Sequence, residues 1–373
     1  MAKLGDICTL VNGYAFKPSD WKSEGLPIIR IQNLNDTSAT FNYFDGEIDE
    51  KYLVNNGDLL FSWSGTPGTS FGAFFWERGK GVLNQHIFNV HPISDVSKEY
   101  LRYALNGNIN KIIDKAHGGV GLQHITKNEL VKIEIPILSS VEQQAIVIVL
   151  DNADRLISLR KQQLEKLDEL VKSRFVELFG DQELNPFGWV QCTLGECCTL
   201  KSGTSLPAEV ENEGGSIPYV KVGDMNYPGN ERYITTSSRY VSEETAGNGL
   251  FGVGSIIFPK RGEAIGTNKK RMTKLPICAD LNVMGVSSNG KLLPEYLFAY
   301  FDLIDLGTLS DGSSVPQINN KNIAPLVICL PPMELQKQFA AFVEQTDKSK
   351  LAVQQSLDKL ETLKKALMQK YFG

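Results

Sequence analysis

The hydrophobic positions between residues 4 and 137 fall in short runs rich in β-branched and aromatic residues, separated by clusters of Gly, Asn, Asp and Ser. Such runs predict strands joined by turns, here ICTLV, LPIIRIQNL, GDLLFSW and HIFNVHPI. One helix is expected among them, at residues 98 to 116, because Tyr100, Leu101, Ala104 and Leu105 share a helical face. Gly107 interrupts that face as a stop signal.

Residues 141 to 179 contain neither proline nor glycine and are rich in Leu, Lys, Gln and Glu, the composition of a long helix. Thirty-nine residues in a helix would make a rod of roughly 58 Å. Its apolar residues recur at the sevenfold spacing of a coiled-coil seam, and they are Leu150, Ala153, Ile157, Leu164, Leu167, Val171 and Leu178. A helix of this length with an apolar seam needs a partner that covers the seam.

The second half of the chain repeats this order. Strands are expected in TLGECCTLKSG, SIPYVKVGDM, GSIIFPKRG and DLNVMGVSS, then a helix at residues 294 to 304, followed by the loop DGSSVPQINNKN and the run APLVICLPP. A second long helix is expected over residues 333 to 373, and its Leu357, Leu360 and Leu367 are the expected partners of the first helix's seam.

The two halves are copies of one unit. KLGDICTL at residues 3 to 10 recurs as TLGECCTL, so that Leu4 lies 190 positions before Leu194, and the first helix repeats 193 positions on, Asp154 matching Asp347. This agreement in register indicates an internal repeat. The mid-domain segments differ: IIRIQNLND faces YVKVGDMNY, LLFSWSGTPG faces IIFPKRGEAIG, and GGVGLQHIT faces DGSSVPQIN. One scaffold with two recognition surfaces is therefore expected.

The predicted fold is α+β with two tandem strand-rich domains, residues 1–140 and 181–332. They are separated by two long helices, residues 141–180 and 333–373, which we expect to form an antiparallel coiled coil with a pseudo-twofold relation between the halves.

Composition places the chain among globular proteins, with 42% hydrophobic and 22% charged residues. No apolar run of about 18 residues and no signal-peptide pattern appears, so we expect a cytoplasmic protein without a membrane segment. The net charge of −5 argues against a uniformly basic nucleic-acid surface. One segment, residues 260 to 274, is basic, and is interpreted as a solvated loop or a phosphate cradle, the former being the commoner case. Its cations are Lys260, Arg261, Lys269, Lys270, Arg271 and Lys274.

Motifs for catalysis and cofactors were sought. No G-x-x-x-x-G-K-[S/T] loop for ATP phosphates occurs, and the six cysteines form no C-x-x-C pair beside histidines at zinc-ligand spacing. The adjacent Cys197 and Cys198 are expected to be buried as small hydrophobic residues. All four histidines lie in the first half, which argues against a duplicated catalytic site, and packing or turn roles are expected for them. No catalytic residue, cofactor or metal site is therefore expected on this chain.

The duplicated order of motifs resembles the specificity subunits of type I restriction-modification systems, over essentially the whole chain. The segments that carry the resemblance are LGDICTLVNGYAF and LGECCTLKSGTS, GDLLFSWSG and GSIIFPKRG, IPILSSVEQQAI and ICLPPMELQKQF, and KLDELVKSRFVELFGD. The second helix entry departs from the pattern, because it reads E-L-Q where the first reads E-Q-Q.

The resemblance implies that each strand-rich domain is a target recognition domain for one half of a bipartite sequence in double-stranded DNA. The helices would set the spacer and dock two methyltransferase subunits. Adenine methylation from S-adenosylmethionine would belong to those partners, and ATP- and Mg-dependent translocation and cleavage to restriction subunits.

Base edges are read mainly by Arg, Lys, Asn and Gln, with Ser and Thr contributing. We therefore expect DNA contacts in the first domain from Arg30, Gln32, Asn33, Trp63, Ser64, Thr66, Gln123 and His124. The corresponding residues of the second domain are Lys221, Asp224, Lys260, Arg261, Asn268, Lys269, Ser314 and Gln317. Ordinary turn chemistry is the alternative at each position, since Asn, Ser and Asp also serve turns.

Three other functions are compatible with the sequence. The chain could be the specificity module of a related restriction system with another nuclease partner, which no residue pattern separates from the first interpretation. It could be a tandem-domain adaptor whose loops bind protein. A self-contained methyltransferase or nuclease is the weakest of the three, because cofactor and metal motifs were not found.

Overall fold

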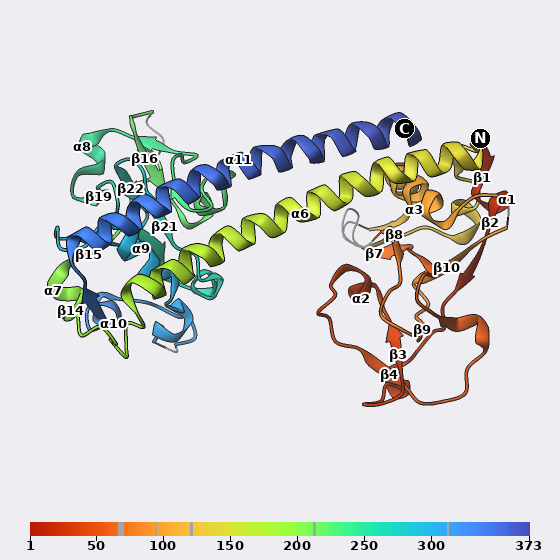
Figure 1. Ribbon diagram of the computed structural model, residues 1–373, viewed down its shortest axis with the longest axis horizontal. Coiled ribbons are helices and arrows are strands. Elements are labelled where there is room, and N and C mark those ends of the chain that lie inside the picture. The colour runs from red at the N-terminus through yellow and green to blue at the C-terminus, as the bar shows by residue number, and fades with distance from the viewer. Residues whose placement is uncertain (66–70, 94, 120–121, 212–213, 312) are drawn as a thin grey trace. The chain divides into compact units, whose positions relative to one another are not determined.

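The chain forms two compact units in the computed structural model, which describes residues 1–65, 71–93, 95–119, 122–211, 214–311 and 313–373 (Figure 1). The first unit comprises Met1–Lys161 and Gln355–Gly373, and the second comprises Gln162–Gln354. Each unit thus contains one strand-rich domain and a part of each long helix, α6 (Ser140–Phe179) and α11 (Met333–Phe372). The two long helices predicted from the sequence are confirmed.

In the first unit the described strands form an inner and an outer layer with two small accessory sheets. The inner sheet, in the order β2-β10-β6-β8, consists of Cys8–Asn12, Ile87–Pro92, Leu59–Ser62 and Gly72–Phe75. The outer sheet, in the order β4-β3-β9-β5, consists of Asn42–Phe44, Leu26–Ile29, Gly81–Leu83 and Leu53–Val54. The accessory sheets are β1 (Ala2–Lys3) with β13 (Glu134–Ile135), and β11 (His117–Gly119), β12 (Leu122–His124) and β7 (Ser64–Gly65).

The second unit repeats the two layers in its described residues. Its inner sheet, in the order β15-β23-β20-β21-β17, consists of Cys198–Ser202, Val283–Ser288, Ile256–Pro259, Arg271–Thr273 and Tyr233–Ile234. Its outer sheet, in the order β18-β16-β22-β19, consists of Tyr240–Val241, Ile217–Val220, Ile277–Ala279 and Leu250–Phe251. The pair β14 (Val190–Thr193) and β24 (Val327–Leu330) corresponds to β1 and β13. In both units the outer sheet has a parallel central pair, β3 with β9 and β16 with β22.

Each domain also contains shorter helices. They are α1 (Leu4–Ile7), α2 (Ile31–Asn35), α3 (Lys98–Gly107), α4 (Ile109–Asp114) and α5 (Lys127–Leu130), then α7 (Leu194–Cys197), α8 (Glu243–Ala246), α9 (Pro294–Asp302) and α10 (Asn320–Ile323). The strand prediction is wrong for Leu194–Cys197 and for Ile7, because Leu194–Cys197 and Leu4–Ile7 each form a helical turn. The backbone N–H groups of Leu4 and Leu194 reach across to the carbonyls of Ile133 and Leu326, and this contact turns the chain.

The fourth residue of each long helix is a buried glutamine. Gln143 accepts a hydrogen bond from the N–H of Ser97 at 3.0 Å through its side chain, and Gln336 does the same for Leu293 at 2.8 Å. Both side chains also donate to carbonyls of the preceding segments. The first Q of E-Q-Q therefore corresponds to the Q of E-L-Q, which fixes the second helix entry 193 positions after the first.

Each long helix ends in a phenylalanine that inserts into a domain core. Phe179 packs on Tyr296 of α9, and Phe372 packs on Tyr100 of α3. A Cβ atom at Gly107 would lie only 2.6 Å from the Cβ of Phe372, so the glycine at the end of α3 is needed for this close approach as well as for ending the helix.

The predicted seam residues are buried or half-buried. Leu150, Ala153, Val171 and Leu357 are buried, whereas Ile157, Leu164, Leu167, Leu178, Leu360 and Leu367 are partly exposed. Leu150 and Val171 belong to the domain cores, so part of the seam also serves the globular layers. That the seam residues pack on one another along the whole helix pair stays a prediction.

Cys197 and Cys198 are buried free thiols, as predicted. Burial raises the pKa of each thiol to about 11, as expected when a charge is removed from water. None of the helices built from described residues combines the length and the apolar character needed to cross a membrane.

Candidate nucleic-acid interface

Polar side chains of the first unit follow β3 and β9 at the point where these two parallel strands end. Arg30 follows β3, and Asn84, Gln85 and His86 follow β9. The N–H of Asn84 donates to the carbonyl of Ile29 at 3.0 Å, which holds the two strand ends together. Together with nearby residues they line a hollow of about 310 Å³, called here the polar hollow: Phe16, Trp21, Arg30, Ile31, Gln32, Asn84, Gln85 and His86.

Arg30 is the cation of the polar hollow, and the side chains of Trp21 and Asn42 contact its guanidinium. The Arg30 guanidinium lies 5.2 Å from the centre of the Trp21 ring and donates to the Oδ1 of Asn42 at 3.1 Å. Near it, the Nε2 atoms of Gln85 and His86 are 3.3 Å apart. Burial, with a contribution from the charge of His124, holds the pKa of His86 below its usual value, so the imidazole is neutral at pH 7.

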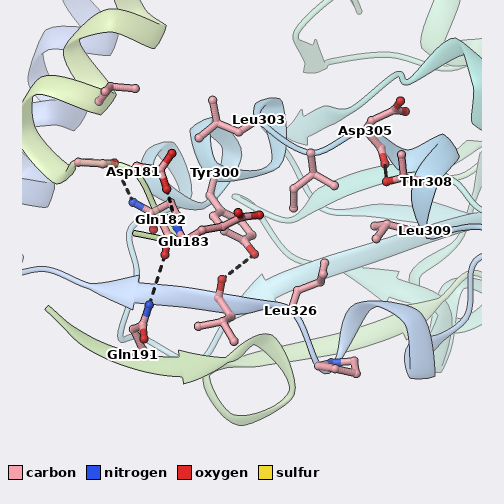
Figure 2. A pocket seen from close by; sticks show the side chains of 15 residues that line it. Asp181, Gln182, Glu183, Gln191, Tyr300, Leu303, Asp305, Thr308, Leu309 and Leu326 are labelled. Atoms are coloured by element: carbon pink, nitrogen blue, oxygen red, sulfur yellow. Dashed lines mark hydrogen bonds between the residues drawn. The ribbon is translucent and has the colours of Figure 1, made fainter. Parts of the chain in front are cut away.

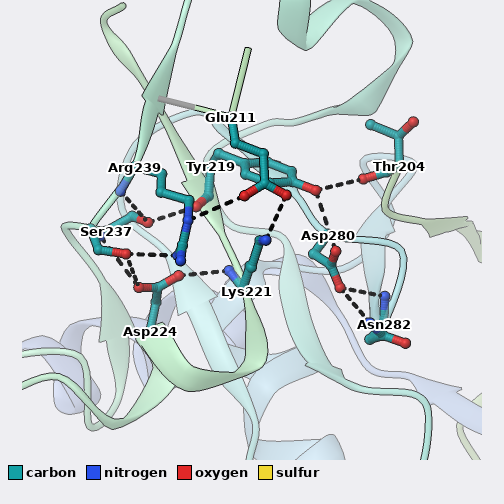
Figure 3. Close-up of polar contacts among 10 residues, drawn as sticks. Thr204, Glu211, Tyr219, Lys221, Asp224, Ser237, Arg239, Asp280 and Asn282 are labelled. Carbon is teal, nitrogen blue, oxygen red and sulfur yellow. Dashed lines mark hydrogen bonds and ion pairs between the residues drawn. The ribbon is translucent and has the colours of Figure 1, made fainter. Parts of the chain in front are cut away.

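The second unit has the same backbone arrangement with different side chains. The N–H of Asp280 donates to the carbonyl of Val220 at 2.9 Å, as that of Asn84 does to Ile29, so Lys221 takes the place of Arg30. Figure 3 shows Lys221 and Arg239 converging on Glu211. Their nitrogen atoms lie 2.6 and 3.4 Å from its carboxylate oxygens. The two cations at this place in the second unit therefore share one carboxylate, which offsets part of their charge.

A second pair of equivalent positions lies at the end of β6 and β20. The N–H of Trp63 donates to the carbonyl of His86 at 3.2 Å, and the N–H of Lys260 donates to that of Asn282 at 2.9 Å. Their side chains match as well: the Nε1 of Trp63 donates to Asn12 at 3.2 Å, and the Nζ of Lys260 donates to Ser202 at 2.9 Å. Asn12 and Ser202 are the last residues of β2 and β15.

The predicted contact residues that come after these positions also lie together. In the first unit β12 pairs with β7, so that His124 stands opposite Ser64 and Gln123 opposite Gly65. In the second unit Arg261 and Gln317 form an antiparallel bridge. The structure thus gathers two corresponding groups, called the strand edges: Trp63, Ser64, Gln123 and His124 in the first unit, and Lys260, Arg261 and Gln317 in the second.

Exposure differs within the strand edges. His124 and Arg261 are exposed, Trp63, Gln123, Lys260 and Gln317 are half-buried, and Ser64 is buried. The Oε1 of Gln123 is enclosed and has no hydrogen-bond partner among the residues that the structure describes. Of the remaining predicted residues, Gln32 and Ser314 are exposed, Lys269 is half-buried, and Thr66 lies outside the described residues.

Three predicted contact residues serve the protein backbone instead. Asn33 and Asp224 are 2% exposed, and each accepts a hydrogen bond from the N–H three residues earlier, Arg30 and Lys221 respectively. Asn268 adopts a left-handed conformation, with φ of 53°, and its Oδ1 accepts from the N–H of Leu306. These side chains stabilise turns, the alternative that residue type alone left open.

The basic segment at residues 260 to 274 is only partly a solvated loop. Lys270 is 5% exposed and donates to the carbonyl of Ile304 and to Asn268, so the solvated-loop interpretation is wrong for it. Burial lowers the pKa of Lys270. Arg271 donates to the carbonyls of Lys270 and Met225. These two cations are bound within the domain, whereas Arg261 at the segment's start is exposed.

A larger cavity lies elsewhere in the second unit. It has a volume of about 810 Å³ and is bordered by the end of α6, the residues after α9, and β24 (Figure 2). Asp181, Glu183 and Asp305 contribute carboxylates to its lining, and Leu303, Leu309 and Leu326 contribute apolar surface. Carboxylates repel DNA phosphates, so this cavity is a poor nucleic-acid site despite its size.

Sequence reasoning missed several residues of the polar hollow and of its counterpart in the second unit. They are Trp21, Asn84, Gln85 and His86 in the first unit and Glu211, Arg239, Asp280 and Asn282 in the second. The alignment of NQHIF with DLNVM in the internal repeat is the signal that could have found the pair after β9 and β22. Among the residues covered by the structure, no cluster of His, Cys, Asp or Glu is arranged to bind a metal ion.

The family comparison agrees with this duplicated arrangement. The chain matches the type I restriction modification DNA specificity domain over residues 1–169 and 186–362, and it belongs to that family. The specificity subunit of the type I restriction enzyme MjaIX from Methanocaldococcus jannaschii is 26% identical over an alignment of 313 residues, and the match covers 78% of this chain and 71% of that protein.

Two solved structures share the fold over the whole chain. The S subunit of a type I restriction-modification system from M. genitalium has a TM-score of 0.58 and 16% identity, covering 100% of this chain and 95% of that one. A chain solved in work on complex assembly and conformational transition of the type I R-M system has a TM-score of 0.59 and 17% identity, with 100% and 96% coverage. The chain is thus a specificity subunit with two tandem domains of mixed helices and strands.

Proposed function

We propose that this chain reads a bipartite sequence in double-stranded DNA for a type I restriction-modification complex, each strand-rich domain reading one half. The observation that supports this most is the pair of strand edges. The same backbone hydrogen bonds place Trp63 in one unit and Lys260 in the other, so one framework presents different side chains. Two domains that read different half-sites need the same backbone framework to position the contacts and different side chains to read the bases.

Recognition would use the exposed and half-buried residues of the strand edges, with Arg30, Gln32 and Lys221 beside them. Arg and Lys donate to guanine and to phosphates, and Gln and His add donors and acceptors. Asn33 and Asp224 are left out of this set because both side chains are buried and bound within the protein, and Asn268 is left out because its Oδ1 accepts from the N–H of Leu306.

The long helices would hold the distance between the half-sites as an antiparallel coiled coil. In the first unit Lys161 lies 3.1 Å from Glu361, and Asp154 pairs with Lys364. In the second unit Asp168 pairs with Lys350. From Asp154 to Lys161 to Asp168 along α6, the partner residue on α11 moves back from Lys364 to Glu361 to Lys350. This is the order expected for antiparallel helices. We propose that one continuous seam relates the two halves by a pseudo-twofold axis.

Catalysis would reside on other subunits in the cytoplasm. Two methyltransferase subunits would dock on the helix faces outside the seam, where Leu156 and Leu159 are partly exposed, and would bind S-adenosylmethionine. ATP and Mg²⁺ would be bound by restriction subunits. The role proposed for this chain is noncatalytic, and it has no step that needs a cofactor.

Co-expression of the chain with the methyltransferase encoded beside its gene, followed by genome-wide mapping of N6-methyladenine by single-molecule sequencing, tests the proposal. A bipartite motif with a fixed spacer is the expected result. A soluble complex that leaves the genome unmethylated would contradict it and favour the protein-binding adaptor. A continuous motif would contradict the division between two domains.

A further inference from the structure

We infer that the polar hollow of the first unit binds the edge of one guanine in the first half-site, and that Arg30 selects it. This inference rests on the proposed function and adds a particular base and residue to it. Other surfaces of the molecule are weaker candidates: the 810 Å³ cavity has an acidic lining, and the exposed apolar residues of the helices belong to the docking already proposed.

The size and walls of the polar hollow suit a planar, polar ligand. Its volume of about 310 Å³ is sufficient for one base edge, and a larger surface would be needed to enclose a nucleotide completely. Phe16 is buried below, whereas Trp21 is 37% exposed although its ring is apolar. A base brought against the indole would cover this surface, and bases stack favourably on aromatic rings.

Arg30 is fixed before any ligand arrives. The Trp21 ring on one side and the Asn42 amide oxygen on the other restrict the guanidinium. Arginine has five N–H donors, and the bond to Asn42 uses one of them. A positioned arginine donates two hydrogen bonds to the O6 and N7 atoms of guanine, the commonest specific contact to a base.

The lining of the hollow adds polar atoms that match a base better than a phosphate. Gln32 is exposed, and the Nδ1 of His86 is enclosed with no hydrogen-bond partner among the residues the structure describes. A buried polar atom without a partner costs free energy until a ligand or water supplies one. Neutral amide and imidazole groups give direction to a base edge and little attraction to a phosphate.

The second unit provides an internal contrast. Lys221 takes the place of Arg30, and in the second unit this side chain forms an ion pair with Glu211 instead of stacking on an aromatic ring. A lysine bound to a carboxylate offers no planar pair of donors. The same place in the two domains is therefore expected to select different bases.

The test uses the full chain in complex with its methyltransferase and the methylation motif as the readout. Residues 181–332 are first exchanged for the corresponding segment of a family member with a different target. The half of the motif that changes is then assigned to the second domain, and the other half to the first. The variants are then Arg30→Ala, Arg30→Lys and Trp21→Ala. Lys22→Ala is the control, because it removes a neighbouring exposed cation that does not line the hollow.

The expected result for Arg30→Ala is loss of discrimination at one guanine of the first half-site, by between about 5-fold and about 150-fold. Arg30→Lys should lose it similarly, since lysine keeps the charge but not the paired donors, and Trp21→Ala should weaken the same position. Every other motif position, and the Lys22→Ala motif, should be unchanged.

Several results would overturn the inference while leaving the proposed function intact. The first is a bipartite wild-type motif with no G·C pair in the first half. The second is an unchanged motif with Arg30→Ala. The third is full rescue of an Arg30→Ala defect by Arg30→Lys with the motif unchanged, which would make Arg30 a phosphate contact. Loss of methylation at all sequences by both Arg30 variants, with unaltered thermal unfolding, would also exclude a single-base role. Absence of any wild-type motif would instead contradict the proposed function.

Discussion

The ring of Phe372, at the end of α11, lies 5.4 Å from the ring of Tyr100 in α3. In the second unit the same relation joins Phe179, at the end of α6, to Tyr296 in α9, with the ring centres 4.7 Å apart. Each long helix thus ends inside a core that also contains the start of the other long helix, since Leu150 lies in the core of Phe372 and Phe339 in that of Phe179. The repeated F-G of the sequence marks one anchoring contact made twice.

Replacement of either anchor should destabilise the protein strongly. Phe179 and Phe372 are at most 2% exposed, so Phe372→Ala and Phe179→Ala each leave a cavity and should lower the free energy of unfolding by about 3–5 kcal/mol. Denaturant unfolding measures this, and Val176→Ala, on an exposed face of α6, is the control with little effect. Losses below about 1 kcal/mol would show that the helix ends are not held by these rings.

The two buried glutamines should be equally important. Gln143→Ala leaves the N–H of Ser97 without its acceptor, and Gln336→Ala does the same to Leu293. An unsatisfied buried group costs about 1–3 kcal/mol. Gln144→Ala, one residue along on an exposed position, should change stability little. A larger loss of stability in thermal unfolding for Gln144→Ala than for Gln143→Ala would contradict the assignment of Gln143 as the counterpart of Gln336.

Arg261 and Lys270 lie nine positions apart in one basic segment, and their replacement should have different effects. Arg261 is exposed on the strand edge, so Arg261→Ala should weaken DNA binding by the complex by about 1–3 kcal/mol and leave unfolding unchanged. Lys270 is buried and bound to Ile304, so Lys270→Ala should lower stability. An unchanged dissociation constant at fixed salt for Arg261→Ala would remove this residue from the interface.

Glu211 should control the charge of the second domain's site. Glu211→Gln removes the carboxylate that pairs with both Lys221 and Arg239. The freed cations should make the plot of log binding constant against log salt steeper by about one to two units. Glu209→Gln changes the same charge at a nearby exposed position and should have less effect. Equal slopes for Glu211→Gln and the wild type would show that these cations stay away from the DNA.

His86 should make the protein less stable in mild acid. Its pKa is lowered in the folded chain by burial and by the charge of His124, so the unfolded chain binds a proton that the folded chain lacks. Stability from this source is present above the unfolded pKa of about 6.5 and is lost as pH falls through the folded value. His86→Gln should reduce the fall in melting temperature between pH 7.5 and pH 5. An unchanged pH profile would exclude this cause.

The repeated framework was predictable because it depends on local patterns. The strand runs at Cys8–Asn12 and Ile87–Pro92 and the helix at Met333–Phe372 follow from periodicity within short windows. The helical turn at Leu4–Ile7 was missed because its cause is a contact with Ile133, far along the chain. Local propensity does not include such contacts.

The candidate site was predictable only in part. The divergent segments located Trp63 and Lys260 correctly at equivalent places. Asn33 and Asp224 are buried and bond to turn backbones, which is the alternative that residue type alone left open for them. Trp21 and His86 were not singled out, because Trp21 contacts Arg30 across the bends before β3 and His86 comes near it through the parallel pairing of β3 with β9. No local pattern reveals that pairing.

The division of labour between the two domains is tested most directly by exchanging residues 181–332 for the corresponding segment of a family member with a different target, and mapping methylation by the resulting complex. A motif in which one half changes, while the other half and the spacer length stay the same, is the result expected if each domain reads its own half-site. A change in both halves, or in neither, would contradict independent reading by the two domains.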